Sequence, residues 1–133
     1  MKSIDTSKLD LKLGPEYRYW LINLKTKTKV PSMNILCRWA LCFSLSESKT
    51  LRDIEENKKE ELGSDQGIEI RWETFTGRDN EIYLSLLKQY CIEEKIDVNE
   101  PNIQKVMRLH VQRGLGYLKS DIKCPEDLMS ILN

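Results

Sequence analysis

Residues Lys25–Glu47 read KTKTKVPSMNILCRWALCFSLSE, and this stretch decides the expected fold. It begins with lysines at every second position, passes a Pro-Ser turn and becomes the most apolar segment of the chain. The TKTKV run has weak helix propensity and Val30 precedes a proline, so a first helix should end near Thr28. Ser32 is a suitable N-cap for a second helix. The stretch therefore predicts a cationic turn, named here the lysine hinge (Lys25, Lys27 and Lys29), beside a helix that is buried.

The helix expected after the hinge, Met33–Ser46, carries a wide apolar face. Such a helix is buried on more than one side, either in the core or in a subunit interface. Its aromatic side chains would each bury about 150–250 Å². We expect this helix to form the core of an oligomer, with four residues as interface anchors: Leu36, Trp39, Ala40 and Phe43.

Upstream of the hinge, residues 8–13 (KLDLKL) alternate polar and apolar side chains, which indicates a short strand. Gly14 and Pro15 end it, and Pro15 is well placed to start a helix. Tyr17, Trp20, Leu21 and Leu24 then recur at helical spacing. Residues 8–46 are therefore expected to form a strand followed by two helices.

Downstream, residues 47–67 are dominated by charged side chains and predict an exposed, flexible connection. IEIRWETF (68–75) predicts a strand, and residues 80–94 an amphipathic helix. A further helix starts at Pro101 and is expected to meet a junction or a close packing contact at RGLGYL (113–118). A short helix should follow at residues 126–132. The whole chain, residues 1–133, is expected to be one α+β domain that is mainly α-helical.

Charge is distributed unevenly although the chain is neutral overall. Residues 1–40 contain eight Lys and Arg against three Asp and Glu, a net charge of +5, and the remainder carries −5. This asymmetry allows one face to meet an anion. The N-terminus has no apolar signal-peptide core and no apolar run is long enough to span a bilayer, so the expected location is the cytoplasm.

A catalytic constellation is difficult to assemble from this sequence. Its one histidine, His110, lies in an amphipathic helix without a nearby acidic partner, so a core or interface role is expected in preference to a general base. The four cysteines have no metal-ligand spacing and are expected to be reduced thiols: Cys37, Cys42, Cys91 and Cys124. No phosphate-loop motif is present. We expect a protein without enzymatic activity, metal or cofactor; a cysteine-dependent sulfur-transfer enzyme is the alternative.

Nucleic-acid binding has better support. Ammonium groups beside the N–H groups of a helix start form a phosphate site, and Arg18 and Arg38 would extend the lysine hinge. No side chains are arranged to read the edges of DNA bases. Binding should therefore be directed to the DNA backbone and be sensitive to salt. The simpler alternative is three solvated lysines on a loop, and the residues alone leave both interpretations open.

The strand–helix–helix order is also compatible with a ribbon-helix-helix transcriptional repressor. In that fold two such units intertwine as a dimer. Its strand would read bases of a palindromic operator through the outward residues Lys8, Asp10 and Lys12. An acidic residue among the three is compatible with this alternative but does not favour it.

Four blocks resemble the family of the DNA sulfur modification protein DndE, in the order found there: MNILCRWALCFSLSE (33–47), IEIRWETFTG (68–77), EIYLSLLKQYC (81–91) and RLHVQRGLGYL (108–118). Together they extend over most of the chain. The resemblance implies a non-catalytic partner of the machinery that installs phosphorothioate linkages in bacterial DNA. It also implies a homotetramer that prefers nicked double-stranded DNA and associates with the other DNA sulfur-modification subunits. The lysines implied to contact DNA match best to the lysine hinge. One departure is Thr28-Lys29, where the resemblance implies Thr-Gly.

Overall fold

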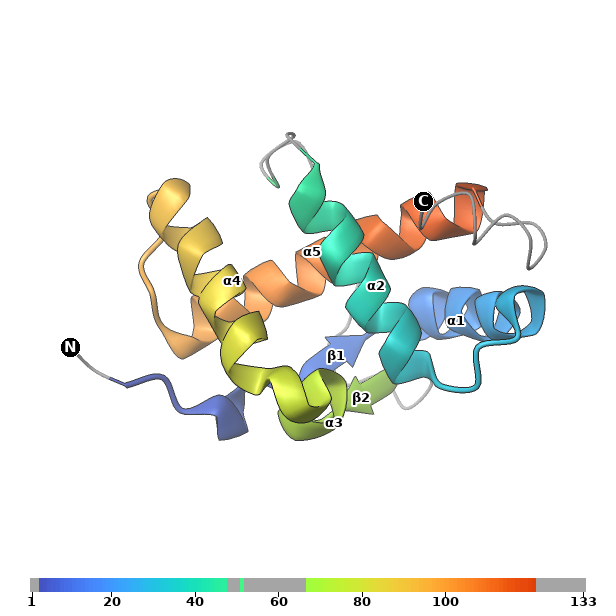
Figure 1. Cartoon of the computed structure of the whole chain (residues 1–133), viewed down its shortest axis with the longest axis horizontal. Helices are drawn as coiled ribbons and strands as arrows, with labels where there is room; N and C mark the ends of the chain where they lie inside the picture. Colours follow the sequence, from blue (N-terminus) through green and yellow to red (C-terminus); the bar gives the residue numbers. More distant parts are fainter. Residues whose placement is uncertain (1–2, 48–50, 52–66, 122–133) are drawn as a thin grey trace.

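The computed structural model describes residues 3–47, 51 and 67–121, and it is mainly α-helical with one small sheet, as the sequence predicts (Figure 1). The elements follow in the order β1 (Leu11–Leu13), α1 (Pro15–Thr28), α2 (Met33–Ser46), β2 (Ile68–Ile70), α3 (Trp72–Thr76), α4 (Asn80–Glu93) and α5 (Glu100–Asp121). The expected connection at 47–67, apart from residues 47, 51 and 67, and the expected helix at 126–132 lie outside the described residues.

The first two helices begin where their N-terminal residues predict. Pro15 occupies the first turn of α1, where a missing N–H costs no hydrogen bond. Ser32 caps α2, because its Oγ accepts a hydrogen bond from the Asn34 N–H at 3.2 Å. The four residues between the helices therefore form a defined turn.

The crossing of α2 and α5 lies at the centre of the fold (Figure 1). α5 has 22 residues, which makes it about 33 Å long at 1.5 Å per residue. It continues through Gly114 and Gly116, so the expected junction at RGLGYL is wrong. The close packing contact, the other expectation for these glycines, is confirmed at Gly114, where a Cβ would lie 1.9 Å from the Ala40 carbonyl oxygen of α2.

β1 and β2 form a two-stranded antiparallel sheet with Leu11 opposite Ile70 and Leu13 opposite Ile68. Leu11 and Leu13 are buried and Lys12 between them is exposed, as alternation in a half-buried strand requires. The two strands lie far apart in the sequence. β1 is nevertheless paired with a strand of its own chain.

The strand expected over residues 68–75 is too long, because β2 ends at Ile70 and α3 follows at once. Trp72 and Phe75 are both buried, which requires helical spacing since alternating strand positions would place them on opposite faces. Asp10 Oδ1 accepts a hydrogen bond from the Trp72 N–H at 3.1 Å, and Thr76 Oγ1 donates to the Trp72 carbonyl at 2.9 Å. Tertiary burial and these two side chains therefore override the β propensity of the segment.

Candidate nucleic-acid interface

The lysine hinge lies at the C-terminal end of α1. Lys27 and Lys29 are exposed and Lys25 is half-buried. At 3.6 residues per turn, Lys25 and Lys27 are about 200° apart around the helix axis, so they flank the helix end from opposite sides. All three ammonium groups can therefore meet one anionic surface only if that surface approaches the end of α1, and not its side.

Lys29 has a left-handed backbone with φ 59° and ψ 19°. Its N–H donates to the Lys25 carbonyl at 2.9 Å, which closes the last turn of α1. Thr28 Oγ1 donates to the Leu24 carbonyl at 2.7 Å and accepts from the Val30 N–H at 3.2 Å. This is the position where glycine is usually preferred, so the structure keeps the turn and places a cation at an exposed position in it.

The lysine hinge has an electrostatic role in the fold itself. The C-terminal end of a helix carries a partial negative charge, which Lys25 and Lys27 in the last turn compensate. The start of α2 carries the opposite partial charge, and Ser32 satisfies only one of its free N–H groups. An anion near this turn would meet lysine side chains and the positive end of α2 together.

The two arginines that extend the hinge in the sequence prediction lie in different places. Arg18 is exposed on α1, and its spacing of seven residues places it on the same side of the helix as Lys25. Arg38 is half-buried on α2, with Nε 3.5 Å from the Asn34 carbonyl oxygen. One of its terminal nitrogens would lie 3.4 Å from a Cβ at Gly77, in the turn between α3 and α4. Arg38 therefore faces that turn.

We expect Lys29→Gly to stabilise the protein by about 1 kcal/mol, since glycine adopts the left-handed conformation without the steric cost that lysine has. If the hinge binds DNA, the same substitution should weaken binding by removing a cation. Urea unfolding and a binding titration measure the two effects separately.

Lys95→Gly is the matched control, because Lys95 is also exposed and left-handed (φ 59°), but lies after α4. It should stabilise by a similar amount and leave DNA binding unchanged. Equal loss of DNA binding in both variants would show that the hinge has no special role.

The four residues expected at an oligomer interface have different surroundings. Leu36 and Ala40 are 0% exposed and belong to the chain's own core, where they offer no surface to a partner. Trp39 and Phe43 are half-buried, and the Phe43 ring lies 5.5 Å from the Tyr117 ring of α5. Only these two aromatic residues of the expected set have surface that a second subunit could cover.

The described cysteines are poorly suited to nucleophilic chemistry. Burial raises the pKa of the Cys37 thiol to about 12, and burial also raises the pKa values of Cys42 and Cys91. A thiol is reactive as its thiolate, so a raised pKa lowers its reactivity at neutral pH. Cys124 lies outside the described residues. Within the described part of the chain, no group of three or more His, Cys, Asp or Glu residues could hold a metal ion.

His110 is a core histidine, as its helical position predicts. It is 0% exposed, and its Nδ1 lies 2.8 Å from Ser44 Oγ. Arg113 Nε donates to the same Oγ at 2.7 Å, so the Ser44 hydroxyl proton is free to point to Nδ1. Burial, and then the charge of Arg113, lower the pKa of His110 from 6.5 to about 3. The residue is thus neutral at physiological pH and connects α2 to α5.

This burial predicts an acid-sensitive fold. The folded state has the lower pKa, so the stabilisation is complete above about pH 6.5 and is lost as the pH falls toward about 3. Within that window the free energy of unfolding should fall by up to about 1.4 kcal/mol per pH unit. His110→Gln, which cannot titrate, should be less stable near pH 7 but lose most of this slope between about pH 6.5 and pH 5.

Urea unfolding at several pH values measures this slope, and NMR offers a direct check because the chain contains one histidine. Its ring signals should keep their neutral shifts well below pH 6. A normal titration near 6.5 would contradict the burial of His110.

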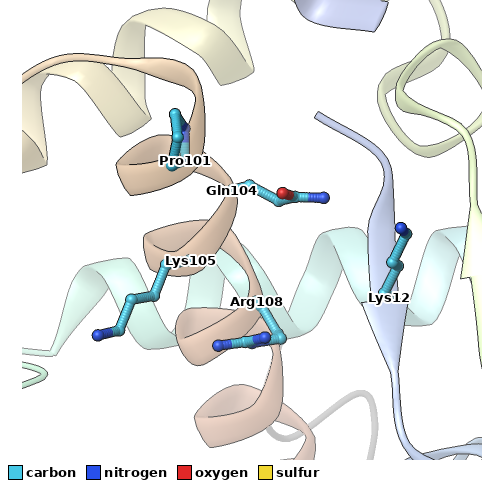
Figure 2. A pocket seen from close by; sticks show the side chains of 5 residues that line it. All are labelled: Lys12, Pro101, Gln104, Lys105 and Arg108. Atoms are coloured by element: carbon cyan, nitrogen blue, oxygen red, sulfur yellow. The ribbon is translucent and has the colours of Figure 1, made fainter. Parts of the chain in front are cut away.

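The sequence prediction did not identify a cationic cluster formed by Lys12, Lys105 and Arg108. These residues line a pocket between β1 and α5 (Figure 2). The signal in the sequence is weak, because Lys12 and α5 are about 90 residues apart and only the spacing on α5 is regular. The hydrogen bond from Gln104 Nε2 to the Asp10 carbonyl, 2.7 Å long, joins the two elements.

Comparison with known proteins gives one family. The family described as DNA sulphur modification protein DndE matches residues 11–126, which is most of the chain. The chain belongs to the DndE family. Membership makes it a DNA sulfur modification protein, and it confirms the family resemblance seen in the four sequence blocks. No curated protein matches the chain. No helix within the described ranges combines the length and the apolar character that crossing a membrane requires.

Proposed function

We propose that this DndE-family chain is a non-catalytic DNA-binding and assembly subunit of a bacterial DNA phosphorothioation complex. It binds the DNA backbone through the lysine hinge, with Arg18 as an extension on α1. It prefers nicked duplex, acts in the cytoplasm as a homotetramer, and associates with the other subunits of the DNA sulfur-modification system.

The observation that carries the DNA-binding proposal is the position of three lysines around the end of α1, beside the positive end of α2. Each lysine that neutralises a phosphate releases a condensed counterion, so binding should weaken steeply as salt rises. A site that approaches DNA end-on suits a backbone contact, since it inserts no element into a groove.

A single copy of the hinge is a weak site. Several copies held together on one assembly would bind a duplex much more tightly than one copy, because the second contact becomes intramolecular. Trp39 and Phe43, both half-buried on α2, are the proposed contacts between subunits. The apolar side chains exposed on the described surface are further surface for such contacts, among them Tyr19 and Ile22 on α1 and Ile82 and Leu86 on α4.

The surroundings of the nucleophilic residues support a non-catalytic role. His110 is fully buried with a lowered pKa, and the thiols of Cys37, Cys42 and Cys91 have raised pKa values. Among the described residues, these three thiols are therefore poorly suited to carry sulfur as thiolates at neutral pH, and the buried His110 is poorly placed to act on DNA.

The ribbon-helix-helix repressor remains the alternative function, and one observation weighs against it. β1 already pairs with β2 of the same chain, so the intertwined pairing between two chains would have to use the other edge of β1. Lys12 is exposed on this strand, but the neighbouring α5 lies against it at Gln104. Part of β1 would therefore be inaccessible to the groove of an operator.

A competition titration distinguishes these functions. Nicked, intact and palindromic operator-like duplexes of equal length compete for the protein, and the proposal predicts that the nicked duplex binds most tightly. Light scattering on the same sample should give about four times the mass of one chain. Tightest binding to the operator would favour the repressor, and a monomer that binds no duplex would contradict the proposal.

A further inference from the structure

A basic pocket of about 260 Å³ lies between β1 and the first half of α5 (Figure 2). Five side chains line it: Lys12, Pro101, Gln104, Lys105 and Arg108. A single buried water needs only about 10–15 Å³ of such space, so a small hydrated anion would fit.

The fold builds this pocket from two regular patterns. Pro101, Gln104, Lys105 and Arg108 are spaced by three and four residues and so form one ridge along α5. Lys12 points away from the core because Leu11 and Leu13 on either side of it are buried. The Gln104–Asp10 hydrogen bond at 2.7 Å holds ridge and strand together.

Three of the five lining residues are cationic and none is acidic. The nearest acid by strand register is Glu69, which lies opposite Lys12 on β2 and offsets one charge. Lys105 and Arg108 already interact within the chain, so an anion would share them. The charged side chains that line the pocket itself are therefore all positive, which suits an anionic ligand.

We propose that this pocket binds a phosphate group. Arg108 presents the planar guanidinium that suits two phosphate oxygens at once. Gln104 Nε2 uses one hydrogen for Asp10 and has a second to donate. Figure 2 shows Lys105 extending away from β1 along the outer side of α5, and its flexible stem allows the ammonium to swing over the opening.

The pocket is separate from the lysine hinge. It lies beside the strand that precedes α1, whereas the hinge lies at the far end of that helix (Figure 1). α1 has 14 residues and is about 21 Å long. Substitutions at one site therefore leave the charge and geometry of the other unchanged, and the phosphate proposal does not depend on the proposed DNA function.

Two-dimensional NMR tests the proposal with inorganic phosphate as the probe, at constant ionic strength. Saturable shifts of the Gln104 side-chain amide and of the backbone over residues 101–108 are expected in the millimolar range. The double variant Lys12→Gln, Arg108→Gln should weaken binding at least about tenfold. Lys88→Gln, on α4, should bind like the parent protein.

The source of the phosphate is distinguished by a second titration with a short oligonucleotide that has no terminal phosphate. Equal shifts at Gln104 with this oligonucleotide identify the group as a backbone diester. Shifts with inorganic phosphate alone identify a free phosphate or a monoester, and the proposal stands in both cases. Absence of saturable shifts with either probe, or shifts that survive in the double variant, would overturn it.

Discussion

Changing Lys25, Lys27 and Lys29 together to glutamate is expected to reduce binding to nicked duplex at least about a hundredfold at low salt. Three attractions to phosphate are removed and three repulsions are added. The fold should survive, because two of the three side chains are exposed and the third is half-buried. A small loss of stability is expected as well, since acids at the end of α1 oppose the helix dipole.

The control for this variant changes the net charge of the protein by the same amount, but at lysines outside the hinge. Lys8, Lys88 and Lys95 are described lysines outside the hinge, and their joint change to glutamate also lowers the net charge by six. This control should retain most of the binding of the parent protein. If both triple variants lose binding equally, the loss reflects overall charge and the hinge is not the site. Circular dichroism establishes that each variant is folded.

Gly114→Ala is expected to destabilise the protein by about 3 kcal/mol or more. The added Cβ would lie 1.9 Å from the Ala40 carbonyl oxygen, 2.4 Å from its carbonyl carbon and 2.6 Å from its Cα. All three are backbone atoms, so no side chain can move aside and α2 must shift away from α5. That shift would disturb the buried Ser44–His110 contact on the same two helices.

Gly116→Ala, two residues further along α5, should have the opposite effect. Its Cβ would meet nothing closer than Trp20 Cζ3 at 4.0 Å, an ordinary contact. Alanine favours a helix interior over glycine by about 1 kcal/mol, so the free energy of unfolding should rise by about that amount. Urea unfolding of the two variants measures both changes, and destabilisation of similar size in both would contradict the close crossing at Gly114.

The helices around the hinge were predictable because their signals are local. Pro15 and Ser32 mark two helix starts, and the apolar spacing identifies the buried face of Met33–Ser46. The family followed from four blocks that the whole-chain match confirms. For His110, the lack of an acidic neighbour in sequence favoured a core position, which the structure confirms.

The remaining differences have tertiary causes. Residues 72–76 form a helix because Asp10, distant in sequence, hydrogen-bonds to Trp72. Two glycines in α5 suggested either a break or a close packing contact, and only the structure shows that the helix continues and that Gly114 packs against Ala40. Leu36 and Ala40 share the apolar face with Trp39, and only the packing of α5 against that face shows which of them remain accessible.

The most direct test of backbone-directed DNA binding is the affinity for nicked duplex measured over a range of salt. Three phosphate contacts predict that log K falls against log salt with a slope of about −2.7 for each engaged hinge, and the glutamate triple variant should lose that slope. This outcome would support the lysine hinge as the DNA contact. Affinity that is independent of salt, or an unchanged slope in the folded triple variant, would contradict it.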